Sequence, residues 1–339
     1  MSNVPTPTPA YSPSDAPVCT IPGADVWAPD NKDWCTPLDD PTWVAPAEAT
    51  LMRDEDTVLG FEAAGRIWAI PWWVMKNHHV ANLTLEGQPF LVTLCEFCVA
   101  GGVFDPVVGG RRFHFRVTGW YRGSPLMVDD DTGSLWALVN ARPLQGEATA
   151  IGRLPKRPIV HATWGEWRRM YPETRVVHGV GEPRDGHGAK HSAPDHANSS
   201  IKTRDPRLRP LDLVVGVEPD TGRRAYPLAS LHAAGGIVED TLGGTPIVVV
   251  TRPGSWLAVA FEAQLDGNPV ELAWDDEQNG QPLLLDRRTG SRFDLWGLGV
   301  AGTWQGRRLP YVPSALKKWA VWAGTYPGTE LWQPASSVK

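Results

Sequence analysis

Two histidines and two cysteines lie close together in one stretch of the sequence. His78 and His79 are adjacent, and Cys95 and Cys98 follow them as a Cys-x-x-Cys motif. No other stretch brings thiols and imidazoles so close together. Thiolate sulfur with imidazole nitrogen suits copper and zinc, and a pair of thiols can also cycle between a dithiol and a disulfide. We therefore expect the chemistry of this chain between residues 70 and 104.

Three interpretations of these residues stay open. In the first, Cys95, Cys98 and one or both histidines bind a metal, and a three-ligand site leaves one position open for substrate or water. If the chain is extended at the histidine pair, only one imidazole can point toward the thiols. In the second, a metal-free dithiol is activated by a neighbouring imidazolium, which Glu96 between the thiols would oppose. The third is a structural pair of buried cysteines, or a structural zinc.

The elements that position these residues are predicted to be mostly β-strands. Apolar runs at 90–94 and 99–104 flank the cysteines, and similar runs of four to seven residues recur between Gly, Asp and Pro turns. Seventeen tryptophans, 32 prolines and 34 glycines are typical of many short strands and turns around an aromatic core. The best helix candidate is 164–171, which Thr163 can cap with Glu166 and which Pro172 ends.

The chain contains an internal duplication. Five landmarks recur in order at separations of 155 to 157 residues, among them Gly60 with Gly216 and a Thr-Gly-Ser turn in each half. We therefore predict a mainly β, β-rich α+β protein made of two degenerate copies of one module with short helices. The predicted divisions are a Pro- and Trp-rich irregular arm at 1–50, a first repeat at 51–177, a polar, His-containing linker at 178–209 and a second repeat at 210–333.

The duplication separates residues that serve the fold from residues free to do something else. Cys95 falls opposite Arg252 and Cys98 opposite Ser255, and neither histidine has a histidine at the matching position. The shared glycines, prolines and tryptophans are expected to make the fold. The thiols and imidazoles, present in one copy only, favour a functional interpretation.

The first copy resembles a bacterial family catalogued as domain of unknown function 3179. That family combines Gly-x-x-x-Ala-Tyr-Pro, Trp-His-Glu, Tyr-Cys-Pro-Leu-Cys and Asp-x-x-Thr-x-Ser-x-Trp patterns. The resemblance places its histidine on His78, its cysteines on Cys95 and Cys98, and its last pattern on Asp129, Thr132, Ser134 and Trp136. Some members carry selenocysteine in the Cys-x-x-Cys motif, which implies redox or soft-metal chemistry. This chain departs from the pattern with His79 in place of the glutamate and Glu96-Phe97 in place of Pro-Leu.

Composition and charge limit the classes of partner. A net charge of −6 gives no electrostatic support for binding nucleic acid, and no apolar run approaches the length of a membrane span. We expect a cytoplasmic protein, because no secretory signal is visible, and hence reduced thiols at Cys19 and Cys35, which could pair in an oxidising compartment. The sequence does not determine the oligomeric state.

These observations lead to one predicted function and two alternatives. The prediction is a metal-dependent oxidoreductase, with copper ranked above zinc, that acts on a small molecule through Cys95 and Cys98. His78 is the preferred third ligand because the family histidine falls there, and His79 is a further candidate. The alternatives are a non-catalytic metal-binding or copper-handling protein and a metal-free dithiol redox protein.

Overall fold

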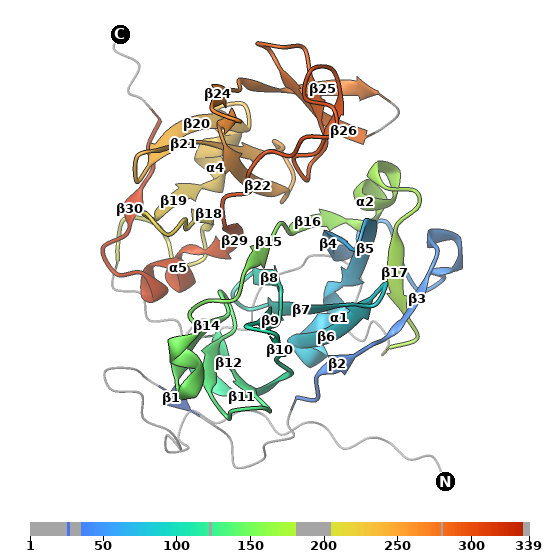
Figure 1. The fold of residues 1–339 in the computed structure, drawn as a ribbon, viewed down its shortest axis with the longest axis vertical. Helices are drawn as coiled ribbons and strands as arrows, with labels where there is room; N and C mark the ends of the chain where they lie inside the picture. The colour runs from blue at the N-terminus through green and yellow to red at the C-terminus, as the bar shows by residue number, and fades with distance from the viewer. Residues whose placement is uncertain (1–25, 28–34, 122–123, 181–204, 279–280, 335–339) are drawn as a thin grey trace.

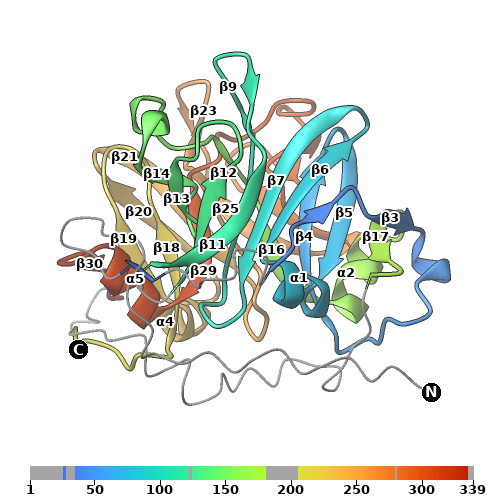
Figure 2. The ribbon, with the colours of Figure 1, turned by 90° about the horizontal axis from the view of Figure 1, so that it is seen from below.

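The computed structural model describes residues 26–27, 35–121, 124–180, 205–278 and 281–334. It confirms a mainly β protein with short helices. The helices α1, α2, α4 and α5 have six or seven residues each and lie toward one side of the molecule (Figure 2). No helix in these ranges is long and apolar enough to cross a membrane.

The first repeat folds into three sheets and two α-helices. Its sheets have the strand orders β16-β4-β5-β17, β15-β8-β7-β6 and β11-β12-β13-β14, with β9 and β10 as a separate hairpin. The elements are β4 (Thr57–Ala63), β5 (Arg66–Pro71), α1 (Trp72–His78), β6 (Val80–Leu85), β7 (Gln88–Cys95), β8 (Ala100–Phe104), β9 (Val107–Val108), β10 (Arg111–Arg112), β11 (Phe115–Tyr121), β12 (Ser124–Asp129), β13 (Leu135–Ala137), β14 (Arg142–Gln145), η2 (Glu147–Ala150), β15 (Lys156–Arg157), β16 (Val160–Thr163), α2 (Trp164–Met170) and β17 (Arg175–His178).

The second repeat follows the same order of elements, except that β15 and η2 have no counterpart among its described elements. Its sheets are β29-β18-β19-β30, β20-β21-β22 and β25-β26-β27-β28. The elements are β18 (Leu213–Val217), β19 (Arg224–Pro227), α4 (Leu228–Ala233), β20 (Ile237–Leu242), β21 (Thr245–Thr251), β22 (Ala258–Glu262), β23 (Gln264–Leu265), β24 (Asn268–Pro269), β25 (Leu272–Gln278), β26 (Gln281–Asp286), β27 (Arg292–Phe293), β28 (Gly299–Ala301), β29 (Ser314–Lys318), α5 (Trp319–Thr325) and β30 (Glu330–Leu331).

The segment before residue 50 adds an edge strand to each sheet of the first repeat. β1 pairs with β11, β2 with β6 and β3 with β17, so three edges that would be open to other chains are covered. The elements are β1 (Val26–Trp27), β2 (Leu38–Asp39), β3 (Thr42–Val44) and the 3-10 turn η1 (Pro46–Glu48).

One close contact, repeated in both halves, shows why the sequence landmarks recur. Gly60 lies under the indole of Trp167, and a β-carbon at Gly60 would meet that ring at 2.2 Å. Gly216 and Trp322 make the same contact, also at 2.2 Å. The two indole N–H groups donate to Thr174 at 3.0 Å and Thr329 at 3.1 Å. These glycines and tryptophans are therefore shared because one packing arrangement is built twice.

The two repeats share their core. Three of the buried apolar clusters contain residues from both halves, and β15, β16, β22 and β29 lie along the border between them (Figure 1). Reciprocal ion pairs cross this border at equivalent positions. Glu62 of the first repeat pairs with Arg308 at 2.8 Å, and Glu218 of the second pairs with Arg153 at 3.8 Å.

A buried group of charges surrounds Glu218 at this border. The ammonium groups of Lys156 and Lys317 each lie 3.6 Å from the same carboxylate oxygen, and the Tyr326 hydroxyl donates to the other oxygen. Exposure is 1% for each lysine side chain and 4% for the glutamate. Lys317 also lies 5.1 Å from the ring centre of Trp322. Burial lowers the pKa of Lys156 to about 7 although Glu218 opposes this, whereas the neighbouring cations lower the pKa of Glu218 to about 2 against the effect of its own burial.

Candidate functional site

The Cys-x-x-Cys motif forms the turn between β7 and β8. Cys95 ends β7, and its carbonyl accepts the Cys98 N–H at 3.2 Å. The next residue, Val99, has φ = 53° and is the only β-branched residue with positive φ in the described ranges. A β-branched residue is strained in this region, and strained backbone tends to gather at functional sites. The turn is therefore held in a conformation that the sequence does not favour by itself.

The two sulfurs are bonded to each other and enclosed. Cys95 and Cys98 form a disulfide with their Cα atoms 5.2 Å apart, and both residues are 0% exposed. They belong to an apolar cluster that includes Trp136 of the first repeat and Val321 of the second. Glu96 and Phe97 lie in the turn between the two cysteines and are partly exposed. The ring of Phe97 lies 6.3 Å from the ring of Trp120.

His79 occupies a position that the second repeat gives to glycine. It caps the C-terminus of α1 with φ = 56°, and its carbonyl accepts the N–H of Leu94 in β7 at 2.9 Å. In the second repeat Gly236 has φ = 87° and its carbonyl accepts the N–H of Thr251 at 2.6 Å. Glycine is the residue that adopts this conformation without strain, so a histidine here lowers stability. We therefore expect the His79 side chain to have a role of its own.

The imidazole of His79 is neutral at neutral pH. Its Nδ1 lies 2.9 Å from the carbonyl oxygen of Leu94, next to Cys95, so Nδ1 carries the hydrogen and Nε2 has the lone pair. Burial lowers the pKa of His79 to about 4, more than the Leu94 hydrogen bond raises it. A neutral imidazole can bind a metal, but it cannot stabilise a thiolate as an imidazolium would.

His78 points elsewhere. It is the last residue of α1, so the pair is not extended as supposed, and its Nδ1 lies 2.8 Å from the carbonyl oxygen of Thr36. The structure thus ties His79 to the strand that carries Cys95 and ties His78 to the segment before the first repeat.

A third cysteine lies in the same apolar cluster as Cys95 and Cys98. The Cys35 thiol donates to the last carbonyls of α1, at 3.0 Å to His78 and 3.3 Å to Asn77. Burial raises the pKa of this thiol to about 12, so it stays protonated. The sequence pattern indicates Cys35 only as a possible partner of Cys19, which lies outside the described residues. No spacing signal could have placed Cys35 near the motif.

The second repeat also reaches the turn. The backbone N–H of Lys318, at the end of β29, donates to the carbonyl of Cys98 at 2.9 Å. Burial raises the pKa of Glu96 to about 7, although Lys76 and Lys318 act in the opposite direction. Burial lowers the pKa of Lys318, and Glu96 partly offsets this. One carboxyl therefore lies within the Cys95–Cys98 turn, and the charges of two amines act on it.

The bonded state of the cysteines does not suit the expected metal. With Cys95 and Cys98 joined, neither sulfur offers a thiolate. Across the ranges that the structure describes, no three His, Cys, Asp or Glu side chains are grouped so that they could hold a metal ion. The disulfide form does not fit copper or zinc, and a metal site stays a prediction for the reduced protein.

Comparison with known proteins now decides the family. The model of the family described as protein of unknown function (DUF3179) matches residues 32–282 and again residues 199–338. The chain belongs to this family. The two overlapping matches agree with the duplicated module, and they confirm the resemblance seen in the first copy. No curated protein and no solved structure matches the chain.

The Asp-x-x-Thr-x-Ser pattern of this DUF3179 protein builds a turn in both repeats. The fully buried Asp129 carboxylate accepts from the Thr132 hydroxyl at 2.9 Å and from the Trp136 indole at 2.7 Å. In the second repeat the buried Asp286 accepts from the Thr289 hydroxyl at 2.6 Å. Because the second copy keeps this network without the cysteines, the pattern serves the fold.

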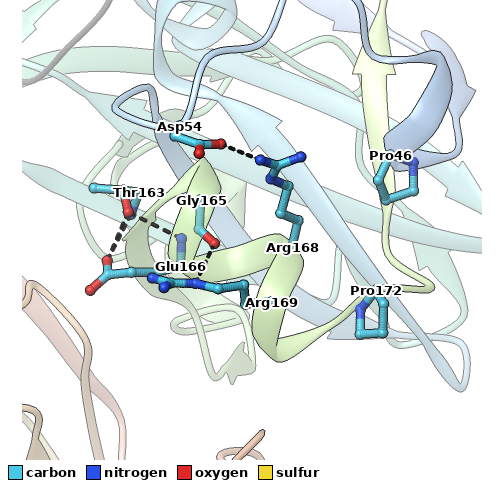
Figure 3. Close-up of a pocket in the computed structure, with 8 residues that line it drawn as sticks. All are labelled: Pro46, Asp54, Thr163, Gly165, Glu166, Arg168, Arg169 and Pro172. Atoms are coloured by element: carbon cyan, nitrogen blue, oxygen red, sulfur yellow. Dashed lines mark hydrogen bonds and ion pairs between the residues drawn. The ribbon is translucent and has the colours of Figure 1, made fainter. Parts of the chain in front are cut away.

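Two surface cavities lie next to the helix α2. Neither is lined by any of the predicted site residues. One, of about 490 Å³, is lined by Asp54, Arg168 and Arg169, among others (Figure 3). Arg168 is paired with Asp54 at 2.6 Å, and Arg169 donates to the Gly165 carbonyl at 3.0 Å. The second, of about 620 Å³, shares Pro46 and Pro172 with the first. The charged groups in Figure 3 largely satisfy one another, so this cavity gives no chemistry of its own.

Proposed function

We propose that this DUF3179 protein is a thiol–disulfide redox protein whose Cys95–Cys98 pair exchanges electrons with a small thiol or disulfide. One observation carries the proposal. The two sulfurs are bonded in a turn whose counterpart in the second repeat has Arg252 and Ser255 on the same hairpin. The module therefore folds without the cysteines, and their presence needs another explanation.

A purely structural disulfide is the weaker explanation, because the stabilisation it provides is small. A bond that closes a loop of only four residues removes little freedom from the unfolded chain, about 2 kcal/mol in the chain-entropy model. Against this, the turn keeps strained backbone at Val99, and α1 ends in strained backbone at His79. Each such residue costs on the order of 1–3 kcal/mol. The stabilisation from the disulfide therefore does not exceed the cost of the two strained residues, and stability alone does not explain the bond.

The proposed exchange balances with two small thiols. The sulfur of the first bonds to one cysteine sulfur, the Cys95–Cys98 bond breaks, and the electron pair stays on the released cysteine as a thiolate that takes a proton. The sulfur of the second thiol then bonds to the sulfur of the first, the bond between the first and the cysteine breaks, and that cysteine sulfur leaves as a thiolate that takes a proton. The two small molecules leave joined as a disulfide. Two electrons and two protons pass from the thiols to Cys95 and Cys98. Because both cysteines are fully buried, the turn must open before a thiol can reach the sulfurs.

The test is a turnover assay with glutathione and β-hydroxyethyl disulfide, followed by the formation of glutathione disulfide. The wild-type chain should accelerate the exchange, and Cys95→Ser and Cys98→Ser should each abolish the acceleration. Cys35→Ala is the matched control, since it removes a buried thiol of the same apolar cluster and should leave the rate unchanged. Equal rates for wild type and both motif variants would refute the proposal.

A second candidate is the metal-dependent oxidoreductase, or a copper-handling protein, in which reduced Cys95 and Cys98 bind copper or zinc with a histidine. His79 favours it, because a metal-binding histidine commonly donates its other ring N–H to a backbone carbonyl, as His79 does to Leu94. The test is the metal content of the reduced protein after exposure to Cu(I) or Zn(II). About one metal per chain in His78→Ala but none in His79→Ala would support this candidate, and no retained metal in the wild type would exclude it.

A further inference from the structure

The residue before α5 differs from its counterpart in a way that the fold does not explain. In the first repeat Thr163 caps α2, with its hydroxyl accepting the Glu166 N–H at 3.3 Å in a capping box. Lys318 holds the same place before α5, and its side chain makes no capping hydrogen bond. Only the second copy has a lysine here.

A lysine is a poor choice for this position on physical grounds. Replacing a threonine cap by a side chain that cannot accept a hydrogen bond destabilises the helix. The N-terminal end of a helix also repels a cation, because the unpaired N–H groups carry partial positive charge. Lys318 is nevertheless only 4% exposed. A threonine, which the equivalent position in the first repeat accepts, would avoid all three costs.

The surroundings of Lys318 indicate what it does instead. Its N–H donates to the Cys98 carbonyl, and Ala320 and Val321 that follow it pack in the apolar cluster of the two cysteines. The preceding residue, Lys317, is directed to Glu218 at 3.6 Å. Successive strand side chains point to opposite faces, so Lys318 lies on the other face of β29 from Lys317. The charge of Lys318 is also close enough to Glu96, between the two cysteines, for each to affect the other.

We propose that Lys318 is a positioning residue of the redox centre, and that its ammonium stabilises the cysteine thiolate released when the Cys95–Cys98 bond opens. This inference rests on the proposed thiol–disulfide function and assigns the second repeat a part in it. Lys318 supplies the positive charge from the other copy, since its backbone is bonded to Cys98. The reduced form is thereby favoured, because an ammonium beside a thiolate lowers its free energy and leaves the disulfide unaffected.

The experiment is a redox titration of the full chain in a series of glutathione to glutathione-disulfide ratios, with the thiols counted by alkylation and mass spectrometry. Lys318→Met should shift the equilibrium about tenfold toward the disulfide, which is about 30 mV for a two-electron couple. Lys318→Arg should restore most of the wild-type value, because it keeps the charge.

Lys318→Thr separates this role from a structural one. It restores the cap that α2 has, so its unfolding midpoint should rise, yet its redox equilibrium should shift as that of Lys318→Met does. Wild-type equilibria in both Met and Thr variants would overturn the role of Lys318 and leave the proposed function standing. A wild-type chain without a reversible transition would overturn both.

Discussion

Replacing the buried Glu218 carboxylate should lower the free energy of unfolding strongly, although it changes a single group. Two lysine ammonium groups lie 3.6 Å from one of its oxygens, and at an effective dielectric constant of about 20 each pair has a gross attraction of about 4–5 kcal/mol. The desolvation of three buried charges offsets much of that gain. In Glu218→Gln the shape and the Tyr326 contact remain. Lys156 and Lys317, however, lose the only carboxylate that lies within 4 Å of either ammonium among the ion pairs of the described residues. We expect a loss of about 3–5 kcal/mol, the usual result of removing one partner of a buried ion pair.

The matched control is Glu62→Gln. Glu62 stands at the equivalent position of the first repeat and pairs with Arg308 at 2.8 Å, but the two side chains are 27% and 43% exposed. Solvent screens such a pair, and its loss should cost no more than about 1 kcal/mol. Urea denaturation of both variants, with the midpoint and slope compared with wild type, measures the difference. Equal costs for the two variants would refute the electrostatic argument.

Three further predictions concern separate features. In Lys156→Met the folded chain loses an enclosed amine whose pKa is lowered to about 7, whereas the unfolded lysine titrates near 10.5. The unfolded wild type therefore binds the extra proton between those values, stability rises with pH across that window, and urea midpoints of the variant should lack this rise. Gly216→Ala places a β-carbon 2.2 Å from the Trp322 ring and should destabilise the chain by about 1–3 kcal/mol, while the open Gly324→Ala should not, as thermal unfolding of both will show. Phe97→Ala removes a side chain that packs against the apolar cluster of the two cysteines and should speed the reduction of Cys95–Cys98 by a small thiol severalfold in a stopped alkylation assay; an unchanged rate would mean that Phe97 does not limit access.

The duplicated fold followed from the sequence because its landmarks are local packing devices. Gly60 and Gly216 must lack a β-carbon under a tryptophan, and the Asp129 and Asp286 turns bury the same carboxylate. Such residues recur wherever the module is built, so two copies in one chain expose them. The capping box at Thr163 and Glu166 was predicted for the same reason, since its partners lie three residues apart.

The surroundings of the cysteines were not predictable in the same way. Lys318 and Cys35 reach the motif through long-range packing, which leaves no spacing signal in the sequence. The sequence argument about the histidine pair applies to an extended chain. In the structure α1 continues to His78, and His79 caps it in the left-handed region. That conformation, stabilised by contacts with β7, decides which imidazole is bonded to the strand that carries Cys95. The preference for His78 rested on the resemblance alone, and it stays a prediction, as do copper, the small-molecule substrate and the cytoplasmic location.

The central claim is that Cys95 and Cys98 exchange reversibly between disulfide and dithiol in the folded chain. The most direct measurement is the fraction of alkylated Cys95 and Cys98, read by peptide mass spectrometry, across a glutathione redox series at neutral pH. We predict one reversible two-electron transition that is the same from the reduced and the oxidised side. A pair that stays bonded at the most reducing ratio of the series, or that never forms the bond at the most oxidising one, would contradict the account.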